Sequence, residues 1–267
     1  MNWNQLISAK RFGMEEFHEE RQENRSEFQR DYDRLIFSAP FRRLQNKTQV
    51  FPLPGSVFVH NRLTHSLEVA SVGRSLGDDV AKALLERHPE LQDSFLPEIG
   101  SIVSAACLAH DLGNPPFGHS GEKAISTFFS EGKGVRLKEK QPDGEQLSPM
   151  EWEDLTHFEG NANAFRILTH QFEGRRKGGF VLTYTTLASI VKYPFSSSLA
   201  GTKSKFGFFV SEEESFHKIA TELGLILLNE HPLKYARHPL VYLVEAADDI
   251  CYQMMDIEDA YKLKILT

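Results

Sequence analysis

Four side chains of the kinds that bind metal ions stand out, because each occupies a segment that is otherwise apolar. His65 and Asp248 lie within such segments, and His110 and Asp111 are adjacent at the end of the apolar stretch 99–112. A buried, unpaired carboxylate is very costly, so a His–Asp pair that closes an apolar helix needs a compensating partner. Two imidazoles and two carboxylates suit a divalent metal with open positions for water and substrate. His110 and Asp111 alone could instead pair with each other or cap the helix, but the other two residues favour a metal site.

An imidazole and a carboxylate three residues apart follow the His–Asp pair. His119 and Glu122 begin a predicted helix, where this spacing places them on one face. A carboxylate that orients an imidazole is the usual arrangement for a proton donor or acceptor. The alternative for this pair is a surface ion pair. A third polar cluster, residues 157–161, begins with His157, which could face the same cavity or cap a helix.

Basic and aromatic side chains near these groups are candidates for phosphate binding. Arg62 precedes His65 by about one helical turn and Tyr252 follows Asp248 by one turn, so each shares a helix face with a proposed ligand. The net charge of −7 would repel a polyanionic substrate, so a phosphate site requires cations concentrated locally. Any one lysine is more often a solvated side chain, but three are candidates for phosphate contact: Lys192, Lys203 and Lys205.

Helices must position these residues, and apolar periodicity predicts three long ones, over residues 61–85, 98–112 and 239–255. The second is apolar on nearly every face, which is typical of a buried helix. Each of the three must bury an apolar face and each carries proposed metal ligands, so we expect them to pack together. Strand-like segments are few and short: residues 57–60, 180–183 and 206–210. The sequence therefore predicts an all-α fold with a few short strands or hairpins.

Composition excludes several other classes of protein. Forty per cent of the residues are hydrophobic and 25 % are charged, as in an ordinary globular protein. The acidic net charge argues against nucleic-acid binding as the main role. Apolar runs fall short of the roughly 18 to 20 residues that span a membrane, and the first residues lack the apolar stretch of a signal peptide. The two cysteines, Cys107 and Cys251, are too few for a disulfide framework, which favours a cytoplasmic location.

Six segments, in order along the chain, resemble the HD superfamily and, within it, the deoxyguanosine triphosphate triphosphohydrolase-like proteins. They span most of the chain and together are specific to that family, whereas an isolated His–Asp dipeptide would not be. The segments are residues 31–38, 41–50, 61–66, 109–119, 157–162 and 245–250.

The resemblance implies a single all-helical HD domain over residues 1–267 and hydrolysis of a deoxynucleoside triphosphate, dGTP or another dNTP, to deoxynucleoside and inorganic triphosphate. The cofactor is a divalent metal, with Mn, Mg, Zn, Fe, Ni and Co all open. The implied metal ligands are His65, His110, Asp111 and Asp248, and the implied catalytic residues are His119, Glu122 and His157. Gln49, Arg62 and Tyr252 match positions around the sugar and phosphates, and Lys192 is added to these substrate contacts for its charge.

The resemblance also implies a homo-oligomer, with a nucleotide or single-stranded DNA as an effector. Family members usually continue past this point, so the chain is predicted to lack the usual C-terminal part. Two alternatives stay open. The chain could be an HD phosphohydrolase for another nucleotide, such as a monophosphate, a cyclic nucleotide or an alarmone. It could also be a non-catalytic nucleotide-sensing module, although such a module is expected to have lost the acid–base residues present here.

Overall fold

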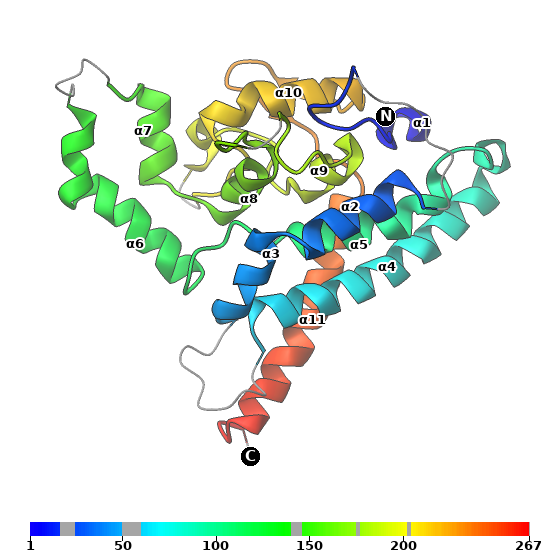
Figure 1. Cartoon of the computed structure of the whole chain (residues 1–267), viewed down its shortest axis with the longest axis horizontal. Coiled ribbons are helices and arrows are strands. Elements are labelled where there is room, and N and C mark those ends of the chain that lie inside the picture. The colour runs from blue at the N-terminus through cyan, green and yellow to red at the C-terminus, as the bar shows by residue number, and fades with distance from the viewer. Residues whose placement is uncertain (17–24, 50–59, 140–145, 175–176, 202–203, 267) are drawn as a thin grey trace.

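Helices make up most of the computed structural model, which confirms the predicted all-α class (Figure 1). The structure describes residues 1–16, 25–49, 60–139, 146–174, 177–201 and 204–266. The α-helices are α1 (Trp3–Leu6), α2 (Glu27–Ile36), α3 (Ala39–Arg43), α4 (Arg62–Arg87), α5 (Ile99–Ala109), α6 (His119–Ser130), α7 (Pro149–Thr156), α8 (Gly160–Thr169), α9 (Tyr184–Ile190), α10 (Glu213–Glu222) and α11 (Val241–Lys262). Short 3₁₀ helices include η4 (Lys133–Lys138), η5 (Ser197–Leu199) and η7 (Val210–Glu212), and strands β1 (Leu227–Asn229) and β2 (Lys234–Tyr235) pair antiparallel.

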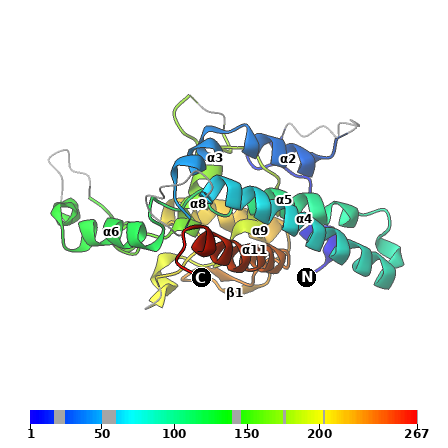
Figure 2. The same cartoon turned by 90° about the horizontal axis from the view of Figure 1, so that it is seen from below.

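Helix α5 is the centre of the fold, and all of its residues are buried. Helices α2, α4, α9 and α11 pack around it (Figures 1 and 2). Its sequence carries no charge, and its Ser104 hydroxyl donates a hydrogen bond to the Ala70 carbonyl of α4 at 3.0 Å. Helix α4 approaches closely at Gly77, where a Cβ would lie only 2.7 Å from Gly100 Cα. The three helices predicted to pack together therefore do so, and each contacts both of the others.

Different contacts fix the start of α4 and the end of α11. Helix α4 begins at Arg62 because Asn61 caps it, accepting hydrogen bonds from the backbone N–H groups of the first turn. Helix α11 continues to Lys262, beyond the predicted end at residue 255. Its last turns are held by Asp259, which accepts a hydrogen bond from the His60 backbone N–H at 2.9 Å and contacts the His60 ring at 2.8 Å. Helical periodicity carries no information about such a distant partner.

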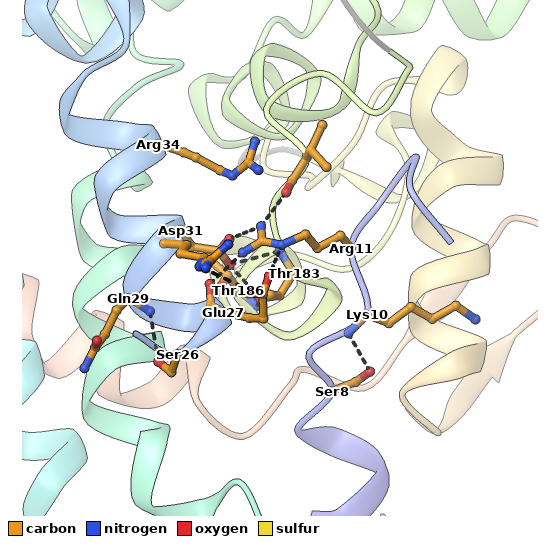
Figure 3. A network of polar contacts seen from close by, with 12 residues as sticks. Ser8, Lys10, Arg11, Ser26, Glu27, Gln29, Asp31, Arg34, Thr183 and Thr186 are labelled. Carbon is orange, nitrogen blue, oxygen red and sulfur yellow. Dashed lines mark hydrogen bonds and ion pairs between the residues drawn. The ribbon is translucent and has the colours of Figure 1, made fainter. Parts of the chain in front are cut away.

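A buried polar network fastens the N-terminal segment to the body (Figure 3). Arg11 Nη1 lies 2.7 Å from Asp31 Oδ1 of α2 and donates to the Val181 carbonyl at 2.6 Å. The other oxygen of Asp31 accepts hydrogen bonds from the backbone N–H and the hydroxyl of Thr183, the residue that caps α9. Burial raises the pKa of Asp31, and the charge of Arg11 opposes that shift. Three separate segments are thus joined at one carboxylate.

The strand-like segments predicted from the sequence are wrong wherever the structure describes them. Residues 180–183 make only an isolated bridge, between Arg11 and Thr183, because Val181 adopts a positive φ of 56° that interrupts an extended chain. Residues 206–210 form a loop that ends in η7, and residues 57–59 lie outside the described residues. The hairpin of β1 and β2 was not predicted, because strand β1 is exposed along its length and lacks the alternation of a half-buried strand.

Helices α6 and α7 extend to one side of this body (Figure 1). Helix α6 buries one side chain, Glu122, near its start. Helix α7 is attached through Asp154, which accepts a hydrogen bond from the Val210 backbone N–H of η7 at 2.7 Å. The start of α6 is therefore the part of this extension that lies at the candidate site.

Candidate active site

The four predicted metal ligands come together where α4, α5 and α11 meet. His65 lies in the first turns of α4, His110 and Asp111 directly follow α5, and Asp248 lies in the middle of α11. Ligand atoms of His65, His110 and Asp111 all lie within 4.8 Å of one another. Asp248 Oδ1 lies 3.0 Å from His65 Nε2 and 3.6 Å from His110 Nε2. This group, which we call the HHDD cluster, brings side chains more than 180 residues apart in sequence into contact.

The HHDD cluster fits a metal ion on the chemistry of its own atoms. The ring of His110 faces the Cys107 carbonyl through Nδ1, and a carbonyl only accepts, so Nδ1 carries the proton. Nε2 is then left without a hydrogen-bond partner among the described residues, in a buried position facing Asp111 and Asp248. A lone pair directed at two carboxylates is repulsive unless a cation lies between them. A divalent ion would satisfy all of these atoms together.

Both carboxylates of the HHDD cluster are held in the ionised form that a metal requires. Burial opposes ionisation of Asp248, but a hydrogen bond to His65 and the nearby His110 lower its pKa to about 2. Burial also opposes ionisation of Asp111, and His110 and Arg62 outweigh it and lower that pKa. The same charges act in reverse on His110: burial disfavours its protonated form, yet the two carboxylates raise its pKa. The cluster thus attracts a cation, whether a proton or a metal.

The cluster opens on a cavity of about 530 Å³. His65 is set behind the wall and is almost wholly buried. The predicted residues that line the cavity are Gln49, Arg62, His110, Asp111, His119, Glu122, Lys192, Lys205, Asp248 and Tyr252. Further lining residues include Asn114, Phe117, Asn161, Tyr193 and Glu245. The proposed metal ligands and the proposed proton-transfer pair therefore face one shared space.

His119 and Glu122 form a close pair at the start of α6. His119 Nδ1 lies 2.7 Å from Glu122 Oε2, and the side chains are 85 % and 11 % exposed respectively. Glu122 is fixed from behind, because its Oε1 accepts a hydrogen bond from the Gly160 backbone N–H at 2.8 Å. Lys205 Nζ lies 3.7 Å from Oε2 and adds a positive charge. The carboxylate is anchored, while the outer edge of the imidazole stays open to the cavity.

Comparison with known proteins supplies the family. A family model described as HD domain matches residues 62–178. Over its whole length the chain is 45 % identical to a protein of Synechocystis sp. and 46 % identical to one of Pseudomonas aeruginosa, both named deoxyguanosinetriphosphate triphosphohydrolase-like protein. It is 36 % identical to a Yersinia enterocolitica protein named deoxyguanosinetriphosphate triphosphohydrolase. The chain belongs to the deoxyguanosinetriphosphate triphosphohydrolase-like family of HD-domain proteins.

The chain spans about three fifths of the length of the curated relatives it matches: 61 %, 58 % and 56 % of these three. The matched HD domain contains His65, His110 and Asp111, whereas Asp248 on α11 lies beyond it. The fold thus completes the cluster of the HD domain with a helix that the family model does not cover. Within the described part of this HD protein, no helix is both long enough and apolar enough to cross a membrane.

The predicted substrate contacts of this HD protein differ in how available they are. Gln49 Oε1 is buried at the cavity wall without a hydrogen-bond partner among the described residues. Lys192 is already paired with Glu245, Nζ to Oε1 at 2.9 Å, and this hydrogen bond raises the pKa of Lys192 although burial opposes the shift. Lys205 pairs with Glu159 at 2.8 Å. Lys203 lies outside the described residues.

His157 is not among the residues that line the cavity. It follows the last residue of α7, and its Nδ1 lies 3.0 Å from the carboxylate of Glu153, one turn earlier. Its position is therefore set by where α7 ends. Sequence reasoning missed Tyr193 as a lining residue and Asn114 as a partner of Asp111, to which its amide donates a hydrogen bond. Two features of the sequence could have indicated these residues: Tyr193 is adjacent to Lys192, and Asn114 lies in the turn that follows the His–Asp pair.

Proposed function

We propose that this chain provides the hydrolytic site of a metal-dependent phosphohydrolase that cleaves a deoxynucleoside triphosphate to deoxynucleoside and inorganic triphosphate. One observation carries the proposal: the HHDD cluster and the His119–Glu122 pair open on the same cavity. The names of the relatives agree with this activity. A cavity of about 530 Å³ is also of the size that holds a nucleotide-sized ligand.

His65, His110, Asp111 and Asp248 would hold the divalent ion. Such an ion supplies Lewis-acid polarisation of a phosphoryl group and neutralises part of the substrate's negative charge. The chain itself contributes the ionised carboxylates and the fixed tautomer of His110 described above. These features orient the ligands before the ion arrives, so little reorganisation accompanies binding.

His119 is the proposed proton donor to the leaving group. Water adds to the α-phosphorus, the bond from phosphorus to the 5′-oxygen breaks, and a proton from His119 Nε2 passes to that oxygen. Glu122 contacts the opposite ring nitrogen at 2.7 Å and orients the ring. The anchoring of Glu122 by the Gly160 N–H keeps the pair aligned. The products are the deoxynucleoside and triphosphate, with the proton lost by the attacking water balancing the one donated.

The remaining lining residues suit the rest of a nucleotide. Arg62 and Lys192 place positive charge at the cavity wall of an acidic protein, where a triphosphate needs it. Gln49 lines the same cavity, and its amide can form hydrogen bonds with a sugar hydroxyl. Tyr252 is half-exposed at the same wall and offers an aromatic face and a hydroxyl.

The test is a product analysis with purified protein and Mn²⁺. Each of the four dNTPs is supplied, and inorganic triphosphate is separated from pyrophosphate and phosphate. We expect triphosphate and deoxynucleoside in equal amounts. Release of phosphate or pyrophosphate instead would contradict cleavage at the 5′-oxygen. A parallel series with nucleoside monophosphates, a cyclic nucleotide and an alarmone tests the alternative substrates, and binding of dNTP without turnover would indicate a nucleotide sensor.

Assembly, effector and location rest on the family resemblance. We propose a homo-oligomer, and the exposed apolar side chains of Met254, Ile257 and Tyr261 on the projecting part of α11 support it. A nucleotide or single-stranded DNA effector and a cytoplasmic location are proposed from the resemblance alone. Light scattering of the purified chain, with and without dNTP or single-stranded DNA, measures its oligomeric state and whether an effector changes it.

A further inference from the structure

The two halves of the proposed site meet at the backbone of one glycine. Gly160 is the first residue of α8, and its N–H donates a hydrogen bond to Glu122 Oε1 at 2.8 Å. On its other side, a Cβ added to Gly160 would lie 2.0 Å from Asn114 Oδ1 and 2.9 Å from Glu122 Oε1. No side chain larger than hydrogen fits there without moving one of these groups. The constraint at this position therefore comes from neighbouring side chains and not from the backbone, since its φ is not in the left-handed region.

Asn114 carries the contact onward to the HHDD cluster. Its side-chain amide donates a hydrogen bond to Asp111 Oδ1, and its backbone carbonyl accepts one from Lys47 Nζ at 2.6 Å. The turn that holds Asn114 is itself pressed against α8, because a Cβ on Gly113 would lie 2.0 Å from the Gly160 carbonyl oxygen. The Asn114 side chain therefore lies between Asp111 and Gly160, at the edge of the cavity that it also lines.

We propose that Gly160 is a positioning residue that sets the His119–Glu122 pair in register with the HHDD cluster. Its N–H fixes Glu122, which orients His119. Its bare Cα admits Asn114, which orients Asp111. The inference rests on the proposed function for its catalytic meaning. Its structural content, a steric link between Gly160 and the metal-binding carboxylate through Asn114, can be measured without substrate.

The test is a double-mutant cycle on Mn²⁺ affinity, measured by the electron paramagnetic resonance signal of free Mn²⁺. Gly160→Ala displaces Asn114, so we expect Mn²⁺ affinity to fall about 10- to 100-fold, as for loss of a residue that orients a ligand. Asn114→Ala should cause a similar fall. The double variant should bind no more weakly than Asn114→Ala, because Gly160→Ala then has no amide to displace. Additive losses would overturn the proposal, since Gly160 would then act without Asn114.

Asn163→Ala is the matched control on the same helix. It removes a hydrogen bond of 2.8 Å from α8 to the Gly113 carbonyl, loosening α8 against the same turn while leaving Gly160, Asn114 and Glu122 in place. Mn²⁺ affinity should stay at the wild-type level. An equal fall in this control would show that any loosening of α8 suffices, and would overturn a specific role for Gly160.

Thermal unfolding supplies a readout that needs neither metal nor substrate. Gly160→Ala should lower the melting temperature. The double variant should recover most of this loss, because Asn114→Ala removes the clash. If Gly160→Ala cannot be purified, the double variant should restore folded protein, and failure of both overturns the proposal. A wild-type chain that binds Mn²⁺ without cleaving dNTPs would refute the proposed function and leave this cycle intact. If the wild-type chain binds no Mn²⁺, the melting temperatures alone test the proposal: recovery in the double variant supports it, and no recovery overturns it.

Discussion

Arg62 and Asp111 form an ion pair in which Arg62 Nη1 lies 2.7 Å from Asp111 Oδ2, and both side chains are buried. Arg62 also lines the cavity, and its Nε has no hydrogen-bond partner among the described residues. The guanidinium thus binds a proposed metal ligand on one side, while the same residue contributes to the cavity wall. It connects substrate binding to the charge state of the HHDD cluster.

Replacement of Arg62 by Ala should weaken both substrate binding and turnover. The change removes a charge-assisted contact present before reaction, worth about 1.5–3 kcal/mol, so kcat/KM should fall about 10- to 100-fold with an increase in KM. Arg62→Lys keeps the charge but lacks the planar guanidinium, and its kcat/KM should lie between those of wild type and Arg62→Ala. Steady-state kinetics on the preferred dNTP measure both. An unchanged KM in Arg62→Ala would remove Arg62 from the substrate contacts.

Replacement of His119 by Ala should spare metal binding and remove most turnover. Positioned proton transfer is worth about 10² to 10⁴ in rate. The side chain is 85 % exposed and outside the HHDD cluster, so melting temperature and Mn²⁺ content should stay near wild type. Glu122→Gln keeps the shape but loses the carboxylate that contacts and orients His119, and its turnover should lie between those of wild type and His119→Ala. Wild-type triphosphate release by His119→Ala would exclude His119 as the donor and make His157 the next residue to test.

Divalent metal should stabilise the fold, because the HHDD cluster joins three helices. Mn²⁺ at about 100 times its dissociation constant contributes about 2.7 kcal/mol, which raises the melting temperature by several degrees. Asp248→Asn should lose most of this increase. Asp249→Asn is a matched control, because Asp249 is the adjacent, exposed carboxylate on the same helix. Loss of the increase in Asp249→Asn instead would mean that the wrong aspartate has been assigned.

The buried polar network at Arg11 should be worth far more than a comparable surface pair. Arg11→Met leaves the fully buried Asp31 without its charged partner, and the free energy of unfolding should fall by about 3–5 kcal/mol. Lys10→Met breaks a neighbouring pair with Glu222 whose side chains are 32 % and 45 % exposed, and should cost less than about 1 kcal/mol. Urea unfolding compares the two variants. Equal losses would contradict the importance of burial.

Buried His238 should make the fold sensitive to acid. Burial lowers its pKa to about 4, and its neutral ring donates to the Leu6 carbonyl through Nε2 and accepts from the Leu240 N–H through Nδ1. The unfolded chain, with a pKa near 6.5, binds the proton more readily. This contribution to stability is therefore complete above about pH 6.5 and is lost as the pH falls towards 4.

At pH 5 this loss amounts to about 2 kcal/mol relative to pH 7.5. Urea unfolding of wild type and His238→Gln at the two pH values measures it. The variant is expected to be less stable at pH 7.5 but to lose less on acidification, because glutamine does not titrate. An identical pH dependence of the two proteins would assign the acid sensitivity to other groups.

The HHDD cluster could be predicted from sequence because its residues are chemically conspicuous in apolar helices. Whether the lysines are free to bind phosphate could not be predicted, because Lys192 and Lys205 are each paired with a carboxylate from another segment, Glu245 and Glu159 respectively. The distance of His157 from the cavity depends on the residue at which α7 ends. Motif and periodicity thus indicated the candidate residues, and tertiary contacts decided which of them face the cavity.

The same distinction explains the errors in the fold. The ends of α4 and the burial of α5 follow from local capping and composition. The extension of α11 depends on the contact of Asp259 with His60, a distant partner that a sequence window does not contain. The strand expected at residues 180–183 is interrupted by the positive φ of Val181, which a β-branched residue rarely adopts and which its sequence therefore does not signal.

Helix α6, which buries only Glu122, has a consequence for local unfolding. Amide hydrogens exchange with solvent through local openings, and an element with few buried contacts opens at low free energy. Exchange should therefore be fast along α6 and slowest in α5, whose residues are all buried. The proposed proton donor would then reside on the most labile helix of the site and the proposed metal ligands beside its most persistent one. The acid–base half can come apart and re-form while the metal-binding half remains folded.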